Sequence, residues 1–297
     1  MKKSFSESEK HILKLFSVGT KFKDQATQYT VVNSGKPTCM KGEPKTDIYI
    51  SAISNNNELK EYKISFKKKN ADFLENKIGA ERAQQLFGDS WQEIIYSAIK
   101  DHIDEFRARP LIYKTRGKRT EQGSITLGWK FELLIRKSGQ LSGNMNLTRS
   151  QVLDVYAGTN ISEDKRDAYV KNKIIPNSGI ANYILFENSD INTAQQAIDE
   201  LITVNDFATM HPSIYFACKA LNYRTFKNRF DGNRPLAVYI DWFISREKLA
   251  YKINFDQPLA HGGNEIKDNL INALRYIGAE STDDLSDMNV LNTQCIH

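Results

Sequence analysis

Two neighbouring segments with alternating apolar and polar residues constrain the fold of this chain most strongly. They are "KTDIYIS" (45–51) and "EYKISFK" (61–67), and each reads as a strand with one apolar and one polar face. The polar stretch "SNNNE" between them is typical of a turn. The sequence therefore predicts an antiparallel hairpin that reverses about Asn56.

The pairing of this hairpin brings opposite charges together on its polar face. A symmetric register about Asn56 sets Asp47 opposite Ser65 and diagonal to Lys67. Directly opposed residues lie roughly 5 Å apart and diagonal ones roughly 7–8 Å apart. We therefore expect a carboxylate and an ammonium group to share one patch of the sheet.

The remaining patterns mix helices and strands without a regular strand–helix–strand rhythm. Helical spacing is predicted over residues 6–17, 71–87, 91–106, 148–157, 162–173, 192–209, 212–222 and 264–277. Further strands are predicted around residues 29–32, 123–137, 179–186, 234–245 and 248–255. This order favours an α+β (α/β) fold with a mixed central sheet flanked by helices.

Composition indicates an ordinary globular protein. The chain has 297 residues, 40% of them hydrophobic, and a net charge of +5, which allows one large core or a core with a subdomain. Its cysteines, Cys39, Cys218 and Cys295, have neither disulfide-framework nor zinc-knuckle spacing and favour a reducing compartment. Neither a secretory leader nor a run of 18 apolar residues occurs, so we expect no membrane association and a cytoplasmic location.

Charge is unevenly distributed along the chain. Residues 107–119 hold six basic and no acidic residues, and a second basic cluster at 224–234 is interleaved with aromatic residues. Lysine and arginine neutralise phosphates, so both segments are candidate contacts for double-stranded DNA. The candidate residues are Arg116, Lys118, Arg119, Arg224, Lys227 and Arg229. Residues 279–297 are acidic and are predicted to form a mobile tail.

The patch around Asp47 suits hydrolysis of a phosphodiester. The anionic phosphate repels hydroxide, so this chemistry needs a divalent cation that neutralises charge and lowers the pKa of water. Mg²⁺ prefers oxygen ligands and keeps several waters, so one or two carboxylates suffice. Asp47 is the predicted anchor for Mg²⁺, and Lys67 is placed to orient the attacking water.

The residues "PKTD" and "ISFK" resemble the signature of PD-(D/E)XK nucleases, in which a strand-borne aspartate precedes an apolar–acid–apolar–lysine strand. The resemblance covers roughly residues 43–87 and implies a restriction-endonuclease-like core. This chain departs from the signature at Ser65, which stands at the second acidic position. Some type II restriction endonucleases have a similar Ser-x-Lys strand and supply the missing carboxylate from the following helix.

Glu81, fourteen residues after Lys67, is the migrated carboxylate that the resemblance implies. Two alternatives remain open: Glu75 in the same predicted helix, and Glu61, which starts a Glu-x-Lys pattern earlier on the strand. The site implied by the resemblance consists of Asp47 and Glu81 as metal ligands, the backbone carbonyl of Phe66 as a further ligand, Ser65 at the vacated position and Lys67 beside the water.

By this resemblance the chain is expected to be a Mg²⁺-dependent, site-specific endodeoxyribonuclease similar to type II restriction enzymes. It would act as a homodimer, since cutting two strands needs two sites, and a cognate DNA methyltransferase would be its genetic partner. The catalytic core is predicted within residues 1–135, and the DNA-recognition and dimerisation part within 136–297. Two alternatives stay open: a phage or mobile-element endonuclease with the same core, and a non-catalytic DNA-binding protein on a nuclease-like scaffold.

Overall fold

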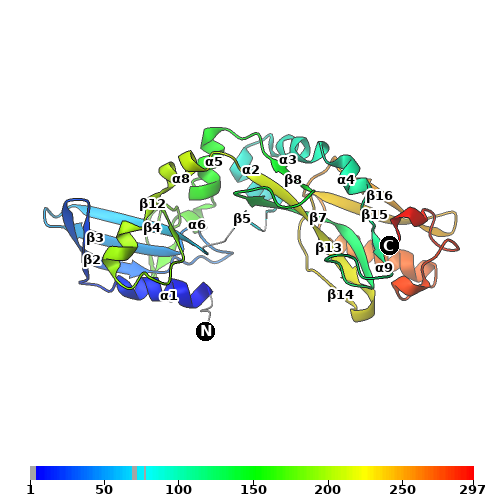
Figure 1. The fold of residues 1–297 in the computed structure, drawn as a ribbon, viewed down its shortest axis with the longest axis horizontal. Helices are drawn as coiled ribbons and strands as arrows, with labels where there is room; N and C mark the ends of the chain where they lie inside the picture. The colour runs from blue at the N-terminus through cyan, green and yellow to red at the C-terminus, as the bar shows by residue number, and fades with distance from the viewer. Residues whose placement is uncertain (1–4, 69–71, 77) are drawn as a thin grey trace. The chain divides into compact units, whose positions relative to one another are not determined.

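The computed structural model describes residues 5–68, 72–76 and 78–297, and the chain forms two compact units (Figure 1). The first unit comprises Met1–Asp72 and Thr148–Pro212, and the second comprises Phe73–Leu147 and Ser213–His297. Both units combine sheets with helices, which confirms the α+β fold class. No helix in the described part of the chain has the length and apolar character needed to cross a bilayer.

The two units do not follow the predicted division at residue 135. Residues 73–135 pack in the second unit, whereas 148–212 return to the first. The reason lies in strand pairing, because Tyr183–Phe186 adds to the first sheet beside the strand that ends at Lys67. A continuous N-terminal core therefore does not form.

The sheet of the first unit is mixed and has the strand order β1-β2-β3-β4-β11-β12. Neighbouring strands are antiparallel except for the parallel pair β4 and β11. Consequently β2, β4 and β11 end, and β3 begins, at the same edge of the sheet. The strands are β1 Lys21–Asp24, β2 Thr27–Gly35, β3 Ile48–Ser54, β4 Leu59–Lys67, β11 Tyr183–Phe186 and β12 Ile202–Thr203.

Helices cover both faces of this sheet. On one face, α1 (Phe5–Leu15) and α7 (Ala194–Asp199) pack on the apolar side chains of β3 and β4. On the other face, α8 (Val204–Met210) lies between β11 and α5 (Arg149–Ala157), because the ring of Phe207 contacts an aromatic ring on each. The polar face of the hairpin is largely buried as well, because Tyr49, Ser51 and Ser65 are at most 5% exposed.

The second unit is built on an eight-stranded sheet whose longest strands are β7 and β13. The α4 ring of Phe106 packs edge-on against Trp129 of β7, and α9 packs on β15. The strands are β5 Phe73–Glu75, β6 Ile112–Tyr113, β7 Ser124–Leu134, β8 Ser142–Asn144, β13 Tyr215–Arg224, β14 Arg229–Phe230, β15 Val238–Ser245 and β16 Lys248–Asn254. The helices are α2 Ala80–Phe87, α3 Trp91–Lys100, α4 Ile103–Arg107 and α9 Gly263–Tyr276.

Four predicted helices are wrong in whole or part. Most of residues 212–222 belong to the strand β13, which begins at Tyr215, rather than to a helix. In 71–87, of which residues 71 and 77 lie outside the described part, β5 precedes a helix that begins only at Ala80. Residues 162–173 hold a four-residue α6 (Glu163–Arg166) and then the hairpin of β9 (Tyr169–Val170) and β10 (Lys173–Ile174). Within 192–209, β12 separates α7 from α8.

The predicted mobile tail is also wrong, because residues 279–297 pack on the second unit. Leu285, Val290 and Cys295 are almost completely buried. The backbone of this segment exchanges hydrogen bonds with Leu249, whose amide donates to Asn289 and whose carbonyl accepts from Leu291. The acidic side chains thus belong to a segment that is held in place by its buried apolar residues.

Candidate functional site

The predicted register of the first hairpin is confirmed. Ile48 of β3 pairs with Ile64 of β4, which sets Asp47 opposite Ser65. The Asp47 amide donates to the Ile64 carbonyl at 2.9 Å, and its carboxylate Oδ2 accepts the Phe66 amide at 2.7 Å. Asp47 is therefore fixed at both backbone and side chain, directly beside the end of β4.

The carboxylate of Asp47 titrates near neutral pH. Burial raises the pKa of Asp47 to about 6, although the ammonium of Lys67 and the hydrogen bond from Phe66 oppose this change. The charge of Glu9 raises the same pKa further. Asp47 and Lys67 are thus electrostatic neighbours, as the hairpin register predicted.

Helix α1 brings a second carboxylate to this edge. Glu9 is 7% exposed, and its Oε2 lies 2.9 Å from the ammonium of Lys36, which follows β2. Burial alone would lower the pKa of Lys36, but the hydrogen bond to Glu9 and the charges of Glu9, Glu43 and Asp47 raise it. We call Glu9, Lys36, Asp47 and Lys67 the edge cluster.

Sequence reasoning missed Glu9, although the sequence holds a signal for it. Glu9 stands three residues before Ile12 and seven before Phe16, both of which are buried core residues. These spacings place all three side chains on one face of a helix. An acidic residue in the core-facing stripe of an amphipathic helix is the feature that would have indicated a site.

Two buried hydroxyl groups next to Asp47 lack partners among the described residues. Ser65 is 0% and Thr46 is 1% exposed, and neither hydroxyl is hydrogen-bonded within that part of the chain. A buried polar group without a partner is costly and commonly marks a site for a water or an ion. The residues present thus fit a hydrated cation held by Asp47.

The end of β11 supplies a third carboxylate to the same edge. Glu187 follows β11 directly, and its amide donates to the Lys67 carbonyl at 2.6 Å. Its carboxylate accepts a short hydrogen bond from the hydroxyl of Ser8 on α1. This contact ties α1 to the end of β11, the strand that pairs with β4.

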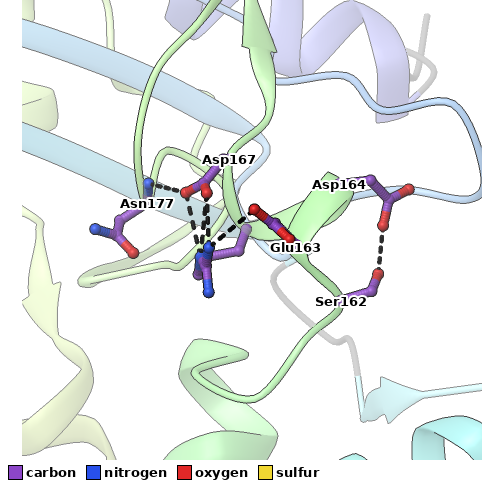
Figure 2. Close-up of polar contacts among 6 residues, drawn as sticks. Ser162, Glu163, Asp164, Asp167 and Asn177 are labelled. Carbon is purple, nitrogen blue, oxygen red and sulfur yellow. Dashed lines mark hydrogen bonds and ion pairs between the residues drawn. The ribbon is translucent and has the colours of Figure 1, made fainter.

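The chain that enters β3 is braced by the segment 162–179. The Gly179 carbonyl accepts the amides of Lys45 and Thr46 at 3.0 and 3.1 Å, and the Gly179 amide donates to the Arg166 carbonyl at 2.9 Å. Within this segment the Asp167 carboxylate accepts from the Arg166 guanidinium at 2.8 Å. It also accepts from the backbone amide of Asn177 at 2.8 Å, as Figure 2 shows. The approach to Asp47 is therefore held by backbone contacts.

Of the three predicted glutamates, Glu61 lies away from the edge cluster within the first unit, whereas the metal-ligand roles of Glu75 and Glu81 stay predictions. Glu61 pairs across the sheet with Ser51 and accepts a short hydrogen bond from the Tyr49 hydroxyl; it lies four residues before Ser65, roughly 13 Å along the strand. Glu75 and Glu81 belong to the second unit. There Glu75 binds Arg82 at 3.0 Å, and the exposed Glu81 accepts only from Gln85 among the described residues.

The first unit thus brings together Asp47, Ser65, Phe66 and Lys67 of the predicted site, with Phe66 presenting its amide to Asp47. Within residues 5–68, 72–76 and 78–297, no three His, Cys, Asp or Glu side chains converge as a metal-binding group. Any cation would therefore rest on the two carboxylates of the edge cluster and on water. Such a donor set suits Mg²⁺ rather than Zn²⁺.

The predicted DNA contacts all lie in the second unit. Arg116, Lys118 and Arg119 are exposed in the connection between β6 and β7, and Arg229 is exposed in β14. Arg224 and Lys227 instead form ion pairs with Glu121.

Comparisons of the chain with protein-family models, with curated proteins and with solved structures found no match.

Proposed function

We propose that this chain is a Mg²⁺-dependent endodeoxyribonuclease that hydrolyses phosphodiester bonds of double-stranded DNA, similar to type II restriction enzymes. The observation that carries the proposal is the partly buried Asp47, held by the Phe66 amide and facing Lys67 from the neighbouring strand. The adjacent unpartnered hydroxyl of Ser65 supports it. The residues that carry this geometry are those that resemble the PD-(D/E)XK signature.

In this proposal Asp47 and Glu9 hold the cation, and Glu9 takes the role that the sequence assigned to Glu81. Glu9 is buried and electrostatically coupled to Asp47, so it suits this role better than a glutamate of the second unit. Bound Mg²⁺ would neutralise phosphate charge and acidify water. The Lys67 ammonium would orient the attacking water, and the Ser65 hydroxyl would accept or donate a hydrogen bond to the hydration shell.

The direct test is digestion of unmethylated phage DNA by the purified full-length protein with Mg²⁺. We expect discrete fragments from the parent protein, intact DNA with EDTA, and intact DNA with Asp47→Asn and Lys67→Ala. Lys63→Ala is the matched control, because Lys63 lies on the same strand as Lys67 but pairs with Tyr49 across the sheet. A smear of products would favour a nonspecific nuclease, and equal cutting by Asp47→Asn would refute the assignment.

A second candidate is a non-catalytic DNA-binding protein on the same scaffold. It is favoured by the absence, within the described ranges, of three converging metal-binding side chains. Under this hypothesis DNA binds but stays intact with Mg²⁺ or Mn²⁺ at every salt concentration tested. Calorimetric titration with a divalent cation distinguishes the two candidates. Only the nuclease hypothesis requires a heat of cation binding in the parent protein that is lost in Asp47→Asn.

The biological setting follows from the same proposal. A homodimer would supply one site for each DNA strand, and sedimentation measures its mass. A type II restriction role implies a cytoplasmic enzyme with a cognate DNA methyltransferase gene nearby. A phage or mobile-element endonuclease would have the same core without that neighbour.

A further inference from the structure

Two connections leave the sheet of the second unit at the same edge. Ser124, the first residue of β7, pairs both with Tyr113 at the end of β6 and with Arg224 at the end of β13. The connection from β6 to β7 (114–123) therefore lies next to the segment 224–230, which ends β13 and includes β14. About a hundred residues separate the two segments in sequence. We call these two segments the basic loop pair, and β14 marks it in the right-hand unit of Figure 1.

Backbone contacts fasten the two loops together. The Gly123 carbonyl accepts both the amide and the hydroxyl of Thr225, at 2.8 and 3.0 Å. Gly123 has φ +82°, and a Cβ there would lie 2.4 Å from the Phe226 ring, so the ring packs directly on the glycine. The loop pair therefore has little conformational freedom to lose when a partner binds.

Ion pairs divide its cations into two groups. The Glu121 carboxylate binds Arg224 and Lys227, and Arg224 also binds Asp231 at 2.6 Å. Arg224 and Lys227 thus join the two loops through Glu121, and their direct contact with DNA stays a prediction. Together with Arg229 these residues line a pocket of about 500 Å³, which therefore has three cations against two carboxylates.

The other cations have no acidic partner. Arg116, Lys118, Arg119 and Arg229 are exposed and form no ion pair with any described residue. The acidic segment 280–287 approaches where the loops leave the sheet, through hydrogen bonds from Lys114 to the carbonyls of residues 283 and 285. The carboxylate of Asp284 is occupied in capping the amides of its own turn.

We propose that the basic loop pair binds the phosphate backbone of duplex DNA through Arg116, Lys118, Arg119 and Arg229. Duplex DNA carries one phosphate charge per roughly 1.7 Å, and unpaired arginines on a fixed loop match such a dense row of anions. Single strands are bound mainly on aromatic platforms, whereas the half-exposed Phe226 ring already packs on Gly123. The inference takes its partner from the proposed nuclease function, but it uses none of the edge cluster.

The test measures binding without cleavage. Fluorescence anisotropy of a labelled 30-base-pair duplex is recorded in EDTA, from low to moderate salt, with the full-length protein. For Arg116→Ala combined with Arg119→Ala we expect at least tenfold weaker binding, and a log–log salt slope smaller by about 2. The matched control is Lys100→Ala combined with Lys252→Ala, which removes two exposed cations of the same unit and should change affinity less than twofold.

Three results would overturn the inference: equal loss in the control, unchanged binding by the loop variant, or tighter binding of the corresponding single strand. Thermal melts of both variants exclude misfolding as the cause of a loss. The outcome stays distinguishable from that of the nuclease proposal. A protein that binds through this surface but never cuts with Mg²⁺ refutes only the nuclease, and one that cuts while the loop variant binds normally refutes only the surface.

Discussion

At the scale of single residues, ionisation of Asp47 in the proposed site destabilises the folded protein. Burial raises the pKa of Asp47 from 3.8 to about 6, so the folded protein resists ionising a group that the unfolded chain ionises freely. Without divalent cations, the contribution of Asp47 to the free energy of unfolding is complete below pH 4 and is lost as the pH rises through 6. The free energy of unfolding of the parent protein should fall by about 1–3 kcal/mol between pH 4.5 and 7 for this reason, and Asp47→Asn should not show this fall. Urea unfolding in EDTA at the two pH values measures it. Identical pH profiles for the two proteins would contradict the burial of this charge.

Glu9 provides a second residue-scale prediction, on a side chain that the alternation of the hairpin does not reveal. The Glu9 charge raises the pKa of Asp47, so Glu9→Gln should lower that pKa. The same variant should weaken Mn²⁺ binding at least tenfold, as removal of one of two carboxylates implies. NMR titration of the Asp47 carboxyl carbon and calorimetry with Mn²⁺ measure the two effects. Glu7→Gln is the control from the same helix, and a Glu9→Gln protein with both properties intact would remove Glu9 from the site.

At the scale of elements, the local sequence pattern predicted the hairpin and its register because apolar and polar residues alternate along both strands. Pattern failed where both faces of a strand are covered. In β13, Phe216, Ala217 and Cys218 are buried in succession, so no alternation remains, and the alanines and leucine favour a helix on propensity alone. Asp47 and Lys67 were predictable because a single turn joins their strands. The core-facing position of Glu9 on its helix was readable from the sequence, but its place beside Asp47 was not, because only the packing of α1 on the sheet brings it there.

Gly179 gives the element-scale prediction, since it braces the entry to β3. A Cβ at Gly179 would lie 1.7 Å from the Lys165 carbonyl oxygen, which is backbone and cannot rotate away. Gly179→Ala should therefore destabilise the first unit by about 1–3 kcal/mol and loosen Asp47. Trp91, Trp129 and Trp242 all belong to the second unit. Far-UV circular dichroism should therefore show an earlier transition while tryptophan fluorescence does not. Gly79→Ala is the control, because Gly79 has φ −110° and the new Cβ would meet only a side-chain carbon of Pro235, at 3.6 Å.

At the scale of the whole molecule, the chain passes between the two units three times, near residues 72, 147 and 212. Neither unit is continuous in sequence, and this arrangement could not be predicted from local patterns. It depends on long-range pairings such as β4 with β11 and β7 with β13. Composition did not reveal the role of the C-terminal segment for the same reason, because its few apolar residues are decisive only once the surface that receives them is known.

Removal of the C-terminal segment tests whether it is a structural part of the second unit or a solvated acidic tail. Deletion of residues 279–297 exposes the sites that now bury Leu285, Val290 and Cys295, and each large apolar side chain lost costs about 1.5–3 kcal/mol. We expect the tryptophan-monitored transition to shift to markedly lower urea concentration. Asp283→Asn combined with Asp287→Asn removes charge without removing packing and should leave the transition within about 0.5 kcal/mol. If the deletion behaved like this double variant, the segment would contribute only charge. The backbone of the segment also pairs with Leu249 and Ile112. We therefore expect the deletion to unfold β6 and β16 first, which amide hydrogen exchange would measure.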